Sequence, residues 1–153
     1  MNVVLYKPEI PPNTGNIGRL CVNTDSILHI VGGASFDFSE KSVRRAGLDY
    51  WEYLKIHFHT NWEEFLKFID SGSAIYYVSK FGSKIYSNIK YPNNPYLVFG
   101  NETKGLPPEI LSKAEIDKIV KIPMGENSRS INLSNAVAIV LYEALRQTRN
   151  WKE

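Results

Sequence analysis

The sequence contains a single cysteine, no long apolar run and little net charge. One thiol, Cys21, excludes an internal disulfide. No apolar stretch approaches the roughly 18 to 20 residues that span a bilayer, so a membrane location has no support. The first residues run directly into NVVLY without the basic segment and cleavage site of an export signal, and we expect a cytoplasmic protein. The net charge of +2 is too small to indicate a nucleic-acid partner by itself.

Several common functional motifs are also missing. No G-x-G-x-x-G follows the first strand-like segment and no G-x-x-x-x-G-K-[ST] occurs, so the usual phosphate cradles of dinucleotide-binding and P-loop proteins are absent. The histidines His29, His57 and His59 lie in strand-like segments without a further ligand at a metal-like spacing, and we predict no metal site. Cys21 lies in an apolar helical segment, which favours a buried structural thiol over a nucleophile.

What is present is a regular alternation of strand and helix patterns. The 153 residues, 43% hydrophobic and 22% charged, suit one globular domain, residues 1–153. Strands interleaved with helices predict an α/β fold, a mostly parallel sheet flanked by helices. The predicted strands are 2–8, 26–33, 53–59, 73–79, 95–100 and 117–124. The predicted helices are 15–25, 39–47, 61–72, 106–114 and a final one after residue 132.

Three loops rich in Gly, Pro, Asn and Ser follow predicted strand ends, at residues 6–16, 100–107 and 122–132. Each loop alone is explained by turn geometry. In open parallel sheets, however, ligands bind beyond the carboxyl ends of the strands, so the three loops together predict a binding site. Gly100, Gly105 and the Ile122-Pro123 pair offer main-chain groups with little side-chain obstruction. Val78, Ile122 and Leu133 would supply apolar walls, a combination that suits a purine-bearing cofactor.

The last helix combines an apolar stripe between Leu133 and Leu145 with an unusually polar start. The stripe recurs at steps of three and four and predicts a helix buried on one face. Capping needs a single Ser, Thr, Asn or Asp, whereas seven polar residues crowd residues 127–135. The surplus predicts a ligand site at this helix N-terminus, where main-chain N–H groups are free.

Four segments resemble a known enzyme family: PEIPPNTGNIGRLC, RRAGLDYWE, LVFGNETKGLP and IPMGENSRSINLSNAVAIVLYEALRQ. Together they resemble the signature motifs of the SpoU branch of the SPOUT methyltransferases, almost from end to end. More narrowly, they are similar to the small bacterial tRNA (cytidine/uridine 2'-O)-methyltransferases that modify the wobble nucleotide. The resemblance implies a deep trefoil knot on the C-terminal side, S-adenosyl-L-methionine as cofactor, a homodimer and the tRNA anticodon loop as substrate.

The resemblance also assigns residues. Asn13 and Arg19 match the first signature, Glu102 the second, and Ser130 with Asn132 the third. The catalytic set it implies is Arg19, Asn13, Glu102 and Asn132, and the cofactor-binding set is Val78, Gly100, Ile122, Ser130 and Leu133. The chain departs from the pattern at Gly18, where relatives generally have an aliphatic residue, and in KFGSK after Val78.

The chemistry of an alcohol nucleophile constrains the roles of these groups. Negative charge that grows on a ribose 2'-oxygen must be stabilised or its proton removed. Family proposals make the arginine matched by Arg19 a general base, but a guanidinium is almost never neutral in proteins. A fixed cation beside the developing alkoxide or on the adjacent phosphate fulfils the same need. Glu102 would then orient Arg19 or another arginine, while Ser130 and Asn132 hold the loop and the cofactor.

RNA contacts are predicted from local basic clusters and aromatic side chains. Lys41, Arg44 and Arg45 form one cluster, and Arg146, Arg149 and Lys152 another; a solvated helix face is the alternative for both. Splayed bases of a loop would stack on Tyr50, Trp51 or Tyr142. Tyr142, Trp151 and the first helix would face a second subunit. The predicted RNA-contacting residues are Arg44, Arg45, Arg129 and Tyr142.

We therefore predict a tRNA 2'-O-ribose methyltransferase acting on position 34. Methylation of another RNA site, a nucleotide- or RNA-binding module without turnover, and a flavodoxin-like regulatory or redox domain remain the alternatives. The composition and loops do not favour the last of these.

Overall fold

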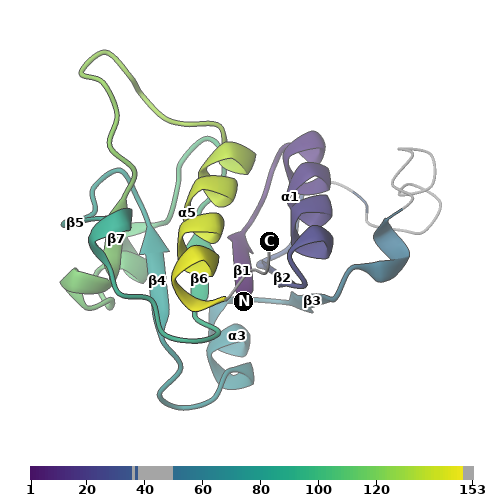
Figure 1. The fold of residues 1–153 in the computed structure, drawn as a ribbon. Helices are drawn as coiled ribbons and strands as arrows, with labels where there is room; N and C mark the ends of the chain where they lie inside the picture. The colour runs from purple at the N-terminus through teal and green to yellow at the C-terminus, as the bar shows by residue number, and fades with distance from the viewer. Residues whose placement is uncertain (36, 38–49, 150–153) are drawn as a thin grey trace.

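The computed structural model describes residues 1–35, 37 and 50–149. Seven strands form one sheet in the order β3-β2-β1-β6-β4-β7-β5 (Figure 1). All of the strand pairings run parallel, as the interleaved pattern predicts, so the loops after the strand ends leave from one edge of the sheet. The strands are β1 (Asn2–Tyr6), β2 (Ile27–Val31), β3 (Ile56–His59), β4 (Ile75–Val78), β5 (Lys84–Ile85), β6 (Tyr96–Phe99) and β7 (Ile119–Lys121).

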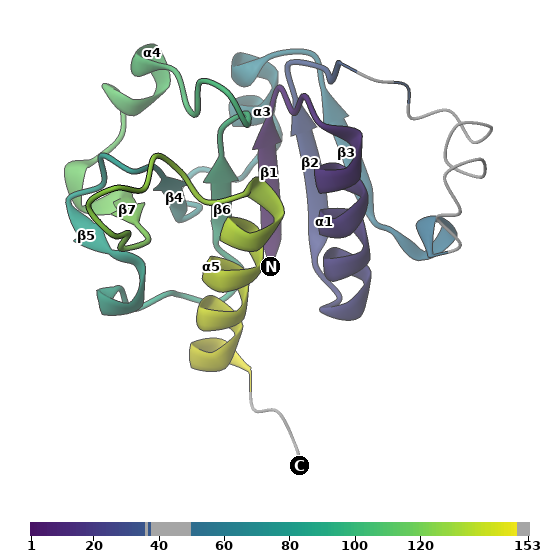
Figure 2. The ribbon, with the colours of Figure 1, turned by 90° about the horizontal axis from the view of Figure 1, so that it is seen from above.

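Helices lie on both faces of the sheet (Figure 2). Helices α1 (Pro11–Asn23) and α5 (Leu133–Thr148) pack side by side on one face, and α3 (Trp62–Phe68) and α4 (Pro108–Leu111) lie on the other. Three short 3-10 helices complete the described structure: η1 (Trp51–Tyr53), η2 (Tyr86–Asn88) and η3 (Ile116–Lys118).

The core consists of two apolar layers separated by the sheet. Alternate residues of β1 divide between them: Val3 and Leu5 join the α1–α5 layer, whereas Val4 joins the layer of α3 and α4. The predicted stripe of the last helix is confirmed, because its core-facing positions are completely buried. These residues are Val137, Val140, Leu141, Ala144 and Leu145.

Helix α1 begins at Pro11, four residues before the predicted start at residue 15. Prolines suit the first turn of a helix because its N–H groups have no partner within the helix. Residues 11–14, which have the composition of a loop, therefore form the first turn of the helix. Cys21 of α1 is fully buried, as predicted, and burial raises the pKa of its thiol to about 12.

Most of the other elements are shorter than predicted; for example, α3 ends at Phe68 instead of residue 72, and β7 spans Ile119–Lys121 instead of 117–124. The third strand begins at Ile56 instead of residue 53, because Trp51–Tyr53 form a 3-10 turn that leads Leu54 into the core. The two-residue strand β5 was not predicted at all, since a pairing this short leaves no periodic pattern. The predicted helix 39–47 lies outside the described residues.

The three histidines gather beneath α3. His29 and His59 are buried, and their Nδ1 and Nε2 atoms lie 3.0 Å apart in a hydrogen bond. His57 stacks on His29 with ring centroids 5.2 Å apart. Burial, followed by the neighbouring His59 and His57, lowers the pKa of His29 to about 3, so the pair stays neutral at ordinary pH.

Membrane-spanning helices and metal-binding clusters are both absent from the described residues. None of the helices in this part of the chain is long and apolar enough to cross a membrane. Within the same residues, no group of three or more His, Cys, Asp or Glu side chains is arranged to hold a metal ion.

Candidate functional site

The carboxylate of Glu102 joins the loop after β6 to the loop after β1. Its Oε2 accepts a hydrogen bond from the Glu9 main-chain N–H at 2.8 Å, and its Oε1 accepts from the Ile10 N–H at 3.1 Å. Asn13 Nδ2 also donates to Oε1, at 3.1 Å. The sequence predicts an arginine as the partner of Glu102; in the structure these three N–H groups take that place. The physical reason is that the segment leading into α1 passes beside Glu102 and presents the main-chain N–H groups of Glu9 and Ile10 and the side chain of Asn13 to its carboxylate.

Asn13 and Asn132 connect the third loop to the same network. Asn132 Nδ2 donates to Asn13 Oδ1 at 3.0 Å, across 119 positions of sequence. The Oδ1 of Asn132 accepts hydrogen bonds from the main-chain N–H groups of Ser134 and Asn135 and thereby caps α5. The predicted convergence of the three strand-end loops is confirmed by this chain of hydrogen bonds.

Gly100 occupies the tightest point of the loop after β6. The chain folds back so that Gly105 N–H donates to Asn101 O at 3.1 Å, and Gly105 has a φ of +71°. A Cβ at Gly100 would overlap the main chain of Gly105 and Leu106. Glycine is therefore required at position 100 for the loop to close, as well as for a ligand to approach its main chain.

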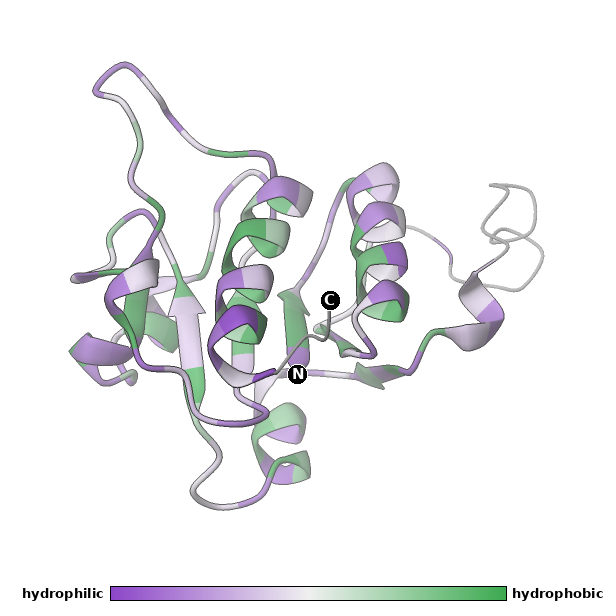
Figure 3. Cartoon of the chain, viewed as in Figure 1, coloured by the Kyte–Doolittle hydropathy of each residue, from purple (hydrophilic) through white to green (hydrophobic). Residues whose placement is uncertain are grey.

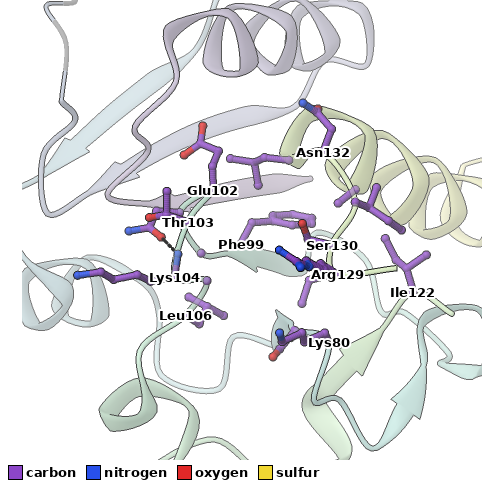
Figure 4. Close-up of a pocket in the computed structure, with 18 of the residues that line it drawn as sticks. Lys80, Phe99, Glu102, Thr103, Lys104, Leu106, Ile122, Arg129, Ser130 and Asn132 are labelled. Atoms are coloured by element: carbon purple, nitrogen blue, oxygen red, sulfur yellow. Dashed lines mark hydrogen bonds between the residues drawn. The ribbon is translucent and has the colours of Figure 1, made fainter. Parts of the chain in front are cut away.

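The three loops and the end of β4 enclose a cavity of about 570 Å³ (Figure 4). All five residues predicted to bind the cofactor line it, together with Asn13, Glu102, Arg129 and Asn132. In this view Glu102 and Asn132 lie at one end and Lys80 at the other. The cofactor-binding residues in the lining are Val78, Gly100, Ile122, Ser130 and Leu133.

The charge of the cavity is predominantly positive. Lys80, Lys104 and Arg129 line it, and Glu102 is the only carboxylate side chain among the described lining residues. Glu102 accepts three N–H hydrogen bonds, and its single negative charge is outnumbered by the three cations. The cavity therefore favours anionic groups of a ligand.

Arg19 lies outside this cavity. It is exposed on α1, with its guanidinium carbon 4.9 Å from the centroid of the Tyr50 ring. Arg19 follows Asn13 by six residues, which places it about 9 Å farther along the helix and roughly 240° around it. Tyr50 is itself fixed, since its hydroxyl donates to Gly15 O of the same helix. The predicted catalytic set is thus divided between the cavity and the outer side of α1.

The other predicted RNA contacts are distributed differently. Arg129 lines the cavity, while Tyr142 lies on α5 away from its lining and is 49% exposed. Trp51 packs against Gly18, whose missing side chain leaves the space: a Cβ there would lie 3.4 Å from the Trp51 ring. Arg44, Arg45 and Trp151 lie outside the described residues.

Sequence reasoning missed three lining residues, Lys80, Phe81 and Lys104. Two belong to the KFGSK stretch, which carries no motif. The only sequence signal of Lys80 and Phe81 is their position directly after strand β4, between the predicted loops 6–16 and 100–107.

A parallel α/β sheet with a ligand cavity at its carboxyl edge, built from three glycine- and asparagine-rich loops, defines a class of nucleotide-binding enzyme folds. Residues 1–142 match the SpoU rRNA Methylase family. The chain belongs to that family.

Individual relatives agree. The tRNA (cytidine(34)-2'-O)-methyltransferase of Escherichia coli K12 is 46% identical over 147 residues, which cover 96% of this chain and 93% of the relative. A structure described as giving insight into 2-OH methylation of C/U34 on tRNA is 36% identical, with a TM-score of 0.88, covering 95% of this chain and 94% of its own. The AviRb methyltransferase of Streptomyces viridochromogenes, in complex with AdoMet, is 27% identical with a TM-score of 0.80; the match covers 96% of this chain and 60% of AviRb.

Proposed function

We propose that this protein transfers a methyl group from S-adenosyl-L-methionine to the ribose 2'-hydroxyl of nucleotide 34 in tRNA. The observation that carries the proposal is the cavity in which the three signature loops meet, lined by every residue expected to hold the cofactor. The end-to-end likeness to enzymes named for cytidine 34 supports the choice of substrate.

The cavity suits the cofactor on its own dimensions and chemistry. About 570 Å³ lies within the range of small-molecule sites, and its apolar walls are Val78, Ile122 and Leu133. The loop closed at Gly100 brings main-chain donors and acceptors to a flat heterocycle, and Ser130 adds a hydroxyl. When bound, S-adenosyl-L-methionine supplies a sulfonium methyl group whose carbon passes to the ribose oxygen, while sulfur keeps the electron pair as a neutral thioether.

The residues of the chain position and polarise the reactants. Asn13, Glu102 and Asn132 fix the three loops, and we assign them positioning roles because their polar atoms are hydrogen-bonded to one another. Because Arg19 lies outside the cavity of its own chain, we assign it to the cavity of the second subunit in the proposed homodimer, where it would hold a phosphate beside the reacting ribose and stabilise the growing negative charge. The hydroxyl proton passes to solvent as the alkoxide character develops.

The electrostatics of the cavity favour RNA as the second substrate. The cofactor carries two positive groups and one negative group at neutral pH, so it does not call for three further cations in its wall. Lys80, Lys104 and Arg129 fit a polyanion that enters the same cavity. A phosphate backbone with unpaired bases provides both the charge and access to a 2'-hydroxyl.

Three further features complete the proposal. A homodimer would form through the outer side of α1 and α5, where Tyr142 (49% exposed) presents apolar surface. The family resemblance implies a trefoil knot in the C-terminal segment, which would include the largely hydrophilic loop that leads from β7 to α5 (Figure 3). We place the enzyme in the cytoplasm, where tRNA is modified.

The test uses the purified protein, tritiated S-adenosyl-L-methionine and tRNA from cells that lack the modification. We expect label in tRNA, and digestion should place it on the 2'-oxygen of nucleotide 34. Label at another nucleotide would refute the position and retain the chemistry. Cofactor binding in calorimetry without any transfer would indicate a binding module, and absence of binding would refute the proposal entirely.

A further inference from the structure

The turn between β4 and β5 holds an aromatic side chain in solvent at the edge of the cavity. Phe81 lines the cavity and is 78% exposed, more than any other large hydrophobic residue in the described part of the chain. A phenylalanine with this exposure gains nothing from burial in the free protein. Because the ring lies at the edge of the cavity, a ligand that enters the cavity can cover it.

The turn that carries Phe81 is fixed by hydrogen bonds. Gly82 N–H donates to Ser79 O at 3.0 Å, and Phe81 N–H donates to Ser79 Oγ at 3.3 Å. The ends of the turn are tied to β7, through Ser79 N–H to Val120 O at 2.9 Å and Ser83 N–H to Ile119 O at 3.0 Å.

Gly82 locks the turn against β7 from inside. A Cβ at this position would lie 2.6 Å from Lys121 N and would overlap the main chain of Val120. The turn therefore cannot rotate to bury Phe81 without breaking its contacts with β7. Because the main chain that carries Phe81 is already fixed, only the side-chain torsions of the ring remain to be ordered when a ligand covers it.

A cation accompanies the ring. Lys80 Nζ lies 5.1 Å from the centroid of the Phe81 ring, and Lys80, Lys104 and Arg129 line the same cavity. An aromatic face beside an ammonium group matches the two parts of a nucleotide, since the base stacks and the phosphate pairs with the cation. A neutral apolar ligand would leave the three cations without a function.

We propose that Phe81 is the stacking platform for an unpaired base of the RNA, either that of the methylated nucleotide or that of its immediate neighbour, with Lys80 on the adjoining phosphate. This inference rests on the proposed function and adds to it the surface that orients the RNA. The platform lies in the KFGSK stretch, where the sequence departs from the family pattern that it otherwise resembles.

The first experiment compares Phe81→Ala, Phe81→Leu and Phe81→Tyr by steady-state methyl transfer to an anticodon stem–loop or tRNA. We expect the KM for RNA to rise about tenfold for the alanine and leucine variants, because stacking needs a ring, and to recover for the tyrosine variant. Phe68→Leu is the matched control: Phe68 is 51% exposed on α3 and does not line the cavity, so its KM should stay unchanged.

The second experiment locates the base. Abasic sites are introduced one at a time through the RNA loop, and each RNA is assayed with the wild type and with Phe81→Ala. At the stacked position, nucleotide 34 or a direct neighbour, the abasic RNA should weaken the wild type and leave the variant with no additional loss. Independent losses at all positions would overturn the proposal, as would coupling confined to distant positions.

Two measurements exclude other partners for the ring. Calorimetry with S-adenosyl-L-methionine should give affinities within about twofold for all three variants; a loss of tenfold or more would assign Phe81 to the cofactor pocket instead. The oligomeric state by light scattering should not change, and dissociation of Phe81→Ala would mean that a second copy covers the ring. If the wild type itself methylates no RNA, the proposed function is refuted. If the wild type methylates RNA and the Phe81 variants behave like it, only the stacking proposal is refuted.

Discussion

Replacing Glu102 with glutamine tests whether the carboxylate clamps the loops or takes part in the chemistry. Glutamine has the same size but offers one acceptor oxygen in place of two. If that oxygen keeps the bonds to Ile10 and Asn13, the new amide N–H₂ faces the N–H of Glu9, with heavy atoms 2.8 Å apart in the native geometry. One charge-assisted hydrogen bond is then lost and two become neutral.

The expected cost follows from these three bonds. Hydrogen bonds to a charged group contribute about 1.5 to 3 kcal/mol each and neutral ones about 1 kcal/mol. The bond that is lost is the one to the Glu9 N–H, and because this bond is only partly buried, water can replace part of the loss; we therefore expect Glu102→Gln to lower the free energy of unfolding by about 2 kcal/mol. For a domain of this length that corresponds to a fall in melting temperature of roughly 4 to 8 °C.

The assay combines urea unfolding with calorimetry of S-adenosyl-L-methionine. The affinity should fall with the stability, because the main-chain groups at Gly100 and beyond lose their fixed position. Glu109→Gln removes a carboxylate from an exposed position on α4 and should change neither quantity appreciably. A Glu102→Gln variant with normal stability and cofactor affinity but no methyl transfer would refute the clamp and give the carboxylate a direct catalytic role.

Three other substitutions have defined outcomes. Gly100→Ala should weaken cofactor binding by more than about tenfold and lower the melting temperature, because even a methyl group overlaps the returning loop; unchanged calorimetry would count against the pocket. Arg19→Ala should reduce methyl transfer at least about a hundredfold with cofactor affinity within a few fold, and near-normal turnover would remove its assigned role. Burial lowers the pKa of His29 from 6.5 in the unfolded chain to about 3 in the folded protein. Below about pH 6.5 the unfolded state therefore binds a proton that the folded state does not, and the folded protein loses stability as the pH falls toward 3. From pH 7 to 5 the wild type should lose about 2 kcal/mol more stability than His29→Asn in urea unfolding, and equal losses would refute the buried neutral pair.

The alternation of strands and helices was predictable because the longer elements, such as β1, β2 and α5, show their period. The parallel sheet and the buried face of α5 follow directly from that pattern. Two elements escaped for physical reasons: β5 is formed only by pairing with β7, and the first turn of α1 is coded by prolines that also suit a loop.

The sequence predicts which loops form the site, but it does not predict which groups hydrogen-bond to one another within it. The strand-end rule places the loops at 6–16, 100–107 and 122–132 together, and their hydrogen bonds agree with it. The partner of Glu102 was predicted wrongly because main-chain N–H groups leave no trace in a sequence. Phe81 was missed for a related reason, since its exposure depends on how the turn is tied to β7.

The polar residues at the start of α5 divide into groups with different tasks. Asn132 alone caps the helix and donates to Asn13, so one side chain serves the core helix and the clamp at once. Ser134 Oγ donates to Asn132 Oδ1 at 2.7 Å and holds it in place, while Arg129 and Ser130 are left to line the cavity. The completely buried face of α5 holds this helix in place, and Asn132 at its start is therefore also held in place. Asn132 in turn positions the other two loops through its hydrogen bond to Asn13. The stability of the core and the geometry of the cavity are therefore coupled through a single asparagine.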